Sequence, residues 1–197
     1  MKRNEAITAA MLIDRLDRLL RAGELSDGLN PAQWDAMRYL GRANRFSRTP
    51  AALADFLAST RGTVSQTLIA LESKGFVIRS SSVRDGRSVD LALSELGRAI
   101  QQRDPLLVLA SNIESALGTK ASELAAALAS VLHQAIVRRG GRAFGVCSTC
   151  RHFQKDHSSR AAGRHYCGLL QEPLSEDDSQ EICAEQELAA ASSSAAL

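Results

Sequence analysis

Several features that mark other classes of protein are missing from this sequence. Its first 146 residues contain no cysteine, and no apolar run free of charge approaches the roughly 18 residues that would span a bilayer. Near the N-terminus, charged residues interrupt any apolar core of an export signal (Asp14, Arg15, Asp17 and Arg18). We therefore expect a cytoplasmic protein without membrane contacts, in a compartment where structural disulfides are rare.

The patterns that catalysis requires are also missing. The sequence holds no motif that combines a nucleophile, a base and an orienting group, and no glycine-rich loop of the kind that cradles phosphate. Cys147 and Cys150 form a Cys-x-x-Cys pair, but the strand-helix-strand alternation of a thioredoxin-like redox motif does not surround it. We therefore expect a binding protein, not an enzyme.

Basic residues are absent from the C-terminal end. All 24 Lys and Arg residues lie at or before Arg164, whereas seven acidic residues follow Cys167. The basic body is suited to a polyanionic partner, although simple solvation of two surfaces would produce the same asymmetry. For the acidic end, we take solvation as the explanation.

The four cysteines of the chain lie in one short stretch, at Cys147, Cys150, Cys167 and Cys183. In a reducing cytosol, clustered cysteines that include a Cys-x-x-Cys pair bind metal more often than they form disulfides. The spacing predicts one metal centre with four thiolate ligands. Tetrahedral zinc is favoured, an iron-sulfur cluster is the first alternative, and a reversible dithiol switch is the second.

Three histidines share this stretch with the cysteines. His152, His157 and His165 are interpreted as solvated or hydrogen-bonded neighbours, because four thiolates already complete a tetrahedron. His165 lies two residues before Cys167, so we expect it to support that ligand.

Apolar periodicity predicts a mainly α fold with a small β wing. Helices are expected at residues 5–21, 31–42, from 50 to about 57, 61–74, 95–117 with a kink at Pro105, and 124–136. The two short helices at 50–57 and 61–74, joined by the polar turn Ser59-Thr60, form a helix-turn-helix. Strands at 76–78 and 89–93 flank the turn signal Asp85-Gly86 and predict a two-stranded wing.

These segments contain an ordered set of residues that resembles the MarR family of winged-helix transcriptional regulators over about residues 5–139. The set comprises Leu53-Ala54, Leu57, Thr60, Thr63-Val64-Ser65, Leu68, Leu71-Glu72, Lys74-Gly75, Val77 and Arg79, followed by Arg84-Asp85-Gly86-Arg87-Ser88 and Leu93-Ser94-Glu95-Leu96-Gly97. The chain departs from the family pattern at Ser82, where an acidic residue is common. It departs again after Gly141, because typical members have no cysteine-rich extension.

The resemblance implies a DNA-binding transcriptional regulator, in the first instance a repressor. It implies a homodimer, whose long terminal helices interlock across a two-fold axis and which reads a pseudo-palindromic operator in double-stranded DNA. The alternative is that the apolar stripes of these helices close a monomeric bundle. Because of the extension, the usual pocket for a small aromatic effector is not assumed, although a small-molecule effector is compatible with the class.

The outer face of the helix at 61–74 carries the candidate base readers. Gln66 is suited to adenine, Arg61 to guanine or phosphate, and Thr63 and Ser65 to a base edge or a phosphate. An ordinary solvated helix face has the same composition. Five further arginines complete the expected interface, two at the wing tip for the minor groove (Arg84 and Arg87) and three for phosphates (Arg45, Arg48 and Arg79).

We divide the chain into a winged-helix DNA-binding and dimerisation domain at residues 1–139, a cysteine-rich extension that binds metal at 140–187, and a disordered tail at 188–197. Two other classes of function stay open. One is a metal-stapled module that binds another protein, and the other is a thiol or iron-sulfur redox protein that does not bind DNA.

Overall fold

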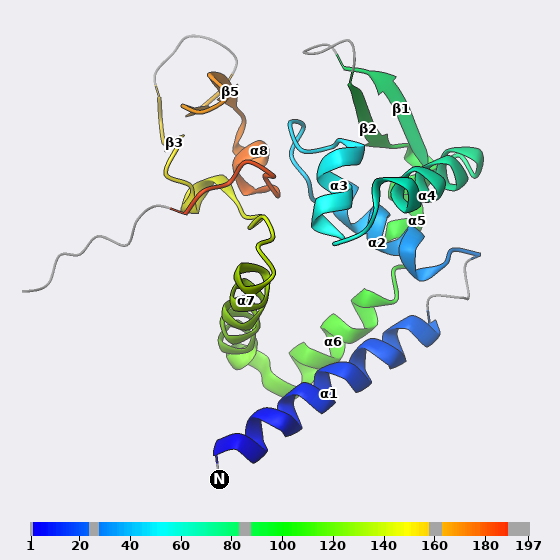
Figure 1. Cartoon of the computed structure of the whole chain (residues 1–197), viewed down its shortest axis with the longest axis vertical. Helices are drawn as coiled ribbons and strands as arrows, with labels where there is room; N and C mark the ends of the chain where they lie inside the picture. The colour runs from blue at the N-terminus through cyan, green and yellow to red at the C-terminus, as the bar shows by residue number, and fades with distance from the viewer. Residues whose placement is uncertain (1, 24–27, 83–87, 158–162, 189–197) are drawn as a thin grey trace, which may run out of the picture.

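The computed structural model describes residues 2–23, 28–82, 88–157 and 163–188. In Figure 1 they form three parts, which are a group of long helices, a winged-helix core and the cysteine-rich extension. Within these residues, every helix is too short or too polar to cross a bilayer. The predicted fold class, mainly α with a small β wing, is confirmed.

The long helices are α1 (Lys2–Gly23), α6 (Leu106–Leu117) and α7 (Ala121–Arg138), with the short 3-10 turn η2 (Gly118–Lys120) between the last two. In Figure 1, α1 lies alongside α6, and residues of both helices line an apolar cleft between them. Neither α6 nor α7 contains a buried residue. Large apolar side chains stay exposed along all three helices (Met11, Leu12 and Leu19 on α1; Leu107 and Val108 on α6; Val131, Leu132 and Val137 on α7). In the described chain, the apolar stripes therefore do not close a monomeric bundle.

The winged-helix core is built on α2 (Pro31–Leu40), α3 (Pro50–Phe56) and α4 (Arg61–Ser73). Each helix begins at a side chain that accepts a backbone N–H of its first turn (Asn30, Thr49 and Thr60). Trp34 and Met37 of α2 are completely buried against the inner faces of the other two helices. The helix-turn-helix prediction is thus confirmed.

The wing follows α4. Strands β1 (Val77–Ser81) and β2 (Val89–Leu93) pair antiparallel, with Val77 opposite Leu93 and Ser81 opposite Val89. Val77, Leu91 and Leu93 face the core. The predicted turn at Asp85-Gly86 lies outside the described residues.

The prediction of one long helix at 95–117 is wrong, because the structure has two helices there, α5 (Glu95–Gln101) and α6. Pro105 has no backbone N–H, and it disfavours the helical conformation of the residue before it, so the helix stops instead of kinking. The side chain of Asp104 then accepts the N–H of Leu106 at 2.8 Å and pairs with Arg38 of α2 at 2.5 Å. The break therefore anchors the start of α6 to the core.

The cysteine-rich extension contains the turn η3 (Cys147–Thr149), strands β3 (Phe153–Gln154), β4 (His165–Cys167) and β5 (Glu172–Leu174), and helix α8 (Glu176–Gln180). The strands form an antiparallel sheet in the order β3-β4-β5. Leu188, the first residue of the predicted tail, pairs with Cys150, and residues 189–197 lie outside the described chain.

Candidate DNA interface and cysteine cluster

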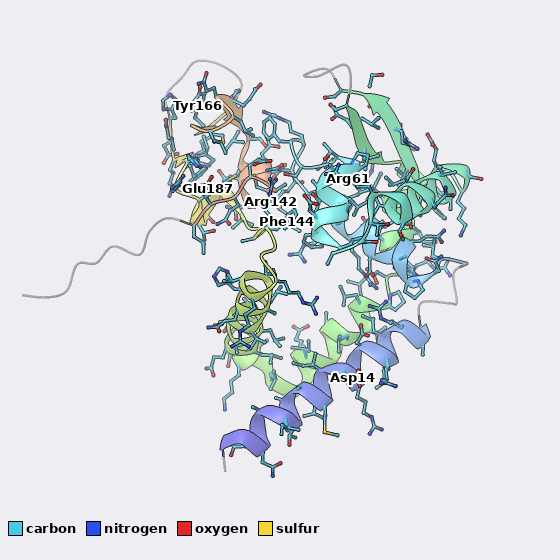
Figure 2. All side chains as sticks on the ribbon, viewed as in Figure 1. Asp14, Arg61, Arg142, Phe144, Tyr166 and Glu187 are labelled. Carbon is cyan, nitrogen blue, oxygen red and sulfur yellow. The ribbon has the colours of Figure 1, made fainter. Side chains whose placement is uncertain are left out.

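Helix α4 presents an apolar inner face and a polar outer face. Val64, Leu68 and Leu71 are buried in the core, at the three- and four-residue spacing of one helix face. On the opposite side, Arg61, Thr63 and Gln66 are exposed and Ser65 is half-buried. Figure 2 shows Arg61 at the start of the helix. The arrangement leaves these side chains accessible to a groove of DNA.

Thr63 and Arg79 each make a contact within the protein. The Thr63 hydroxyl lies 2.9 Å from the hydroxyl of Thr60, the residue that caps α4. Arg79 of β1 reaches Glu72 of α4 at 3.8 Å, a long ion pair between side chains that are partly exposed. An exposed ion pair of this kind contributes about 0–1 kcal/mol, so it would not prevent Arg79 from turning to DNA.

The wing-tip residues Arg84 and Arg87 lie outside the described residues, so their role in the minor groove stays a prediction. What the structure provides is the base of the wing. The backbone N–H of Leu91 donates to the backbone carbonyl of Arg48 at 2.7 Å, which ties β2 to the segment before α3. The wing and the helix-turn-helix are thereby fixed to each other.

Arg45 and Arg48 lie in the α2–α3 loop (residues 41–49), and both contact the cysteine-rich extension. Arg45 pairs with Asp178 at 3.1 Å and donates to the carbonyl of Pro173, and Arg48 pairs with Glu181 at 3.2 Å. These contacts were not predicted from the sequence, although the basic body and the acidic end indicated that oppositely charged surfaces were available to pair. The contacts of Arg45 and Arg48 with DNA phosphates stay a prediction.

The four cysteines are brought into one region of the extension. Cys147 lies on η3, Cys150 directly after it, Cys167 at the end of β4 opposite Phe153, and Cys183 on a segment that pairs with Gly145. Cys147, Cys167 and Cys183 are buried, whereas Cys150 is partly exposed. None of the four is in a disulfide.

Cys147 and Cys183 shift each other's pKa in opposite directions. The hydrogen bond to Cys183, together with burial, raises the pKa of the Cys147 thiol well above its usual range, and the charges of Cys167 and Cys150 add to this effect. The same hydrogen bond lowers the pKa of Cys183 to about 6 against the opposing effect of burial. The thiolate is the form that binds metal, so the lowered pKa of Cys183 is a shift in the direction that metal binding would require.

The α2–α3 loop also acts on Cys183. The polar side chains of Asn44 and Ser47 beside Cys183 contribute to its low pKa. Asn44 is 1% exposed, and its Nδ2 has no partner of ordinary hydrogen-bond geometry among the described residues. A buried amide donor beside a thiolate is the outer contact expected around a sulfur ligand.

As the described side chains stand, no three of the His, Cys, Asp and Glu residues are close enough together to hold a single ion. The donor set nevertheless has the chemistry of a metal centre. Three of the four thiols are buried, and the charges of the other three cysteines all act on Cys147. Thiolates at such spacing match zinc and iron-sulfur centres, and they do not match a site for magnesium or calcium.

The histidines of the extension have partners other than the cysteines. His165 is buried, accepts the N–H of Asp156 at 3.1 Å on Nδ1, and lies 3.1 Å from Glu176 through Nε2. His157 stacks on Tyr166, and His152 lies 3.6 Å from Glu187. These contacts agree with the interpretation of the histidines as hydrogen-bonded neighbours.

Comparison with known proteins agrees with this geometry. Residues 27–88 match the model of the MarR family, a segment that runs from before α2 to the start of β2. No curated protein matches the chain at a significant level.

Several solved structures share the fold. The transcriptional regulator BldR from Sulfolobus solfataricus is 21% identical, with 68% of this chain and 99% of BldR covered and a TM-score of 0.54. Wild-type MarR from E. coli in its apo form is 26% identical, with 64% of this chain and 96% of MarR covered and a TM-score of 0.50. A point mutant of MepR from S. aureus is 19% identical, with 66% of this chain and 96% of MepR covered and a TM-score of 0.53. Since the sequence match and the fold similarity agree, the core of this chain is a MarR-like winged helix.

Proposed function

We propose that this protein is a DNA-binding transcriptional regulator, in the first instance a repressor, that acts as a homodimer on a pseudo-palindromic operator. The observation that carries the proposal is helix α4 of the MarR-like winged helix. Its inner face is buried, and its outer face holds Arg61, Thr63 and Gln66 in reach of a groove. The chain is thus proposed to work by binding, without chemistry of its own.

The exposed apolar faces of α1, α6 and α7 support the dimer. Val131 on α7 is 62% exposed and Met11 on α1 is 67% exposed. Monomeric proteins rarely leave apolar surface of this extent uncovered, and a second copy of the same helices is a self-complementary cover. A two-fold dimer carries two α4 helices and therefore reads two half-sites.

Selection from a random pool of DNA duplexes tests the proposal. We expect the protein to enrich a sequence with two inverted half-sites about one helical turn apart, and to bind it less tightly as salt is raised. Replacing both Arg84 and Arg87 by Ala should weaken binding and flatten its salt dependence. If no duplex is bound even at low salt, the proposal is wrong and a protein-binding module becomes the better interpretation.

We also propose that Cys147, Cys150, Cys167 and Cys183 bind one metal centre in each chain, either zinc or an iron-sulfur cluster, that responds to metal or redox state. The burial of three of the four thiols and the lowered pKa of Cys183 support the site. The other elements of the extension are strands of two or three residues, a 3-10 turn and a five-residue helix. So small a unit commonly needs a metal to stay folded.

Metal analysis of anaerobically purified protein distinguishes the two centres. Colourless protein with one zinc in each chain indicates a zinc site, and brown protein with iron and sulfide indicates a cluster. Each of the four Cys→Ser variants should lose metal, whereas a His157→Ala control, which removes a stacked but non-ligating ring, should keep it. Retention of metal in all four variants would contradict the site. A reversible colour change in a protein that binds no duplex would instead favour the redox alternative.

A further inference from the structure

The last cysteine lies on a segment that is docked on the winged helix. In this docking segment (residues 181–184), the N–H of Ile182 donates to the carbonyl of Arg42 at 2.7 Å, and the carbonyl of Ile182 accepts the N–H of Asn44 at 2.9 Å. The N–H of Ala184 donates to the hydroxyl of Ser47 at 2.8 Å. Backbone hydrogen bonds on both sides of Cys183 therefore connect it to the α2–α3 loop.

Apolar contacts surround these hydrogen bonds. Ala184 is buried with the residues of the winged-helix core, and Ile182 packs against the same core. Phe144, from the segment that pairs with Cys183 through Gly145, packs edge-on against Phe56 of α3 at 5.1 Å between ring centroids. Figure 2 shows Phe144 where the extension meets the winged helix. The docking segment and Phe144 thus pack with the hydrophobic core of the winged helix.

The docked extension occupies the arginines of the loop. Asp178 holds Arg45 and Glu181 holds Arg48, and Arg48 directly precedes the helix-turn-helix. The first helix of such a motif crosses the phosphate backbone of DNA, so cations at its start are placed to meet phosphates. Asp178 is buried, but both arginines and Glu181 are partly exposed, and ion pairs that reach solvent are individually weak. The hydrogen bonds of the docking segment, and the position of Cys183 within it, are what keep the carboxylates in place.

We propose that the docking segment is an autoinhibitory contact, in which assembly of the cysteine site keeps Arg45 and Arg48 away from DNA and release of Cys183 makes them available to phosphates. The proposal rests on the proposed functions of the winged helix and of the cysteine site. While Cys183 is held beside Cys147, the local concentration of Asp178 and Glu181 at the loop is high, and DNA has to compete with them. Once Cys183 is released, the segment becomes part of a polar tail. DNA phosphates then replace Asp178 and Glu181 as the partners of Arg45 and Arg48.

The salt dependence of DNA binding tests this coupling. Binding of a mixed-sequence duplex, long enough for a dimer, would be measured by fluorescence anisotropy across a salt series. Each arginine that gains a phosphate steepens the slope of log affinity against log salt by about 0.9. Relative to wild type, Cys183→Ser is therefore expected to steepen the slope by about 1.8 per protomer, and Glu181→Gln, which retains all four cysteines, by about 0.9.

Two controls separate the docking contact from a general loss of negative charge. Glu187→Gln makes the same charge change in the same extension, but Glu187 pairs with Arg151 and does not contact the loop, so the slope should stay at the wild-type value. In a background with both Arg45→Ala and Arg48→Ala, Cys183→Ser should leave the slope unchanged.

The outcomes distinguish this inference from the functions on which it rests. If the duplex is bound and the slope is the same in wild type, Cys183→Ser and Glu181→Gln, the autoinhibitory contact is overturned while DNA binding stands. The contact is also overturned if Cys183→Ser steepens the slope equally without the two arginines. Absence of binding by every form overturns the proposed function together with the inference. If Cys183→Ser does not fold, Glu181→Gln beside Glu187→Gln decides the question.

Discussion

Gln66 is the residue on which base preference is expected to depend most. Its side chain is exposed on the outer face of α4, and an amide of this kind can bind adenine through two hydrogen bonds. Gln66→Ala should weaken binding of the preferred operator by about 1–3 kcal/mol and relax the preference at one position of each half-site. Competition between operator variants that differ at a single base pair measures both effects.

The control for this variant is Gln102→Ala, which removes an exposed glutamine at the end of α5. Binding and preference should both be unchanged in it. If the Gln66→Ala protein selects the same operator with the same affinity, the glutamine is part of an ordinary solvated face and another residue reads the base.

At the scale of a residue, the sequence predicted what depends on neighbours along the chain. Asn30-Pro31 and Thr49-Pro50 are local patterns that mark helix starts, and α2 and α3 begin there. The contacts of Arg48 could not be predicted, because its partner Glu181 lies 133 residues away. Only the charge asymmetry indicated that a basic and an acidic surface were available to meet.

At the scale of an element, the junction between the wing and α5 depends on a close approach that only glycine permits. Ser94 caps α5 by accepting the N–H of Gly97 at 2.9 Å, and it donates to the carbonyl of Gly75 at 2.6 Å. A Cβ atom at Gly97 would overlap the backbone carbonyl oxygen of Phe76. The Leu-Ser-x-x-Gly pattern of the sequence therefore has a steric explanation.

We expect Gly97→Ala to lower the free energy of unfolding by about 1–3 kcal/mol, because the backbone of β1 or α5 has to move. Gly62→Ala is the matched control. Gly62 lies in the first turn of α4, where a Cβ atom meets only the hydroxyl of Thr60 at 3.9 Å. An alanine there should raise stability, by about 0.5–1 kcal/mol, since glycine is the poorer helix former. Urea denaturation of the two variants would show opposite shifts, and a neutral Gly97→Ala would contradict the steric argument.

The break at Pro105 and the paired arginine show why elements were harder to predict than caps. Apolar periodicity continues across residues 95–117, so it indicates one helix, whereas the local chemistry of proline ends α5 and starts α6. The partner of Asp104 is Arg38, which lies 66 residues earlier. Periodicity reports which face is apolar, and it does not report where a helix changes direction.

At the scale of the whole molecule, the described chain leaves a large apolar surface uncovered, and a second copy of the chain is the cover that we propose. Large apolar side chains of α1, α6 and α7 stay exposed in the described residues, whereas the hydrogen bonds of the docking segment go to the winged helix. The surface proposed for dimerisation and the surface that holds the docking segment are thus different. Changes at one should leave the other intact.

Introducing a charge into the uncovered faces should therefore separate the protomers without unfolding them. We expect the double variant Met11→Asp with Val131→Asp to sediment as a monomer, because two buried carboxylates in each protomer would each need an ionic partner that the apolar faces do not offer. Affinity for the operator should fall by a factor of about 10²–10⁴, since the second half-site is no longer tethered to the first. The control is Ile78→Asp, which changes an apolar residue on β1 that is also more than half exposed and which should remain dimeric. A double variant that still sediments as a dimer would show that the two-fold contact uses a different surface, and the apolar faces would then need another occupant.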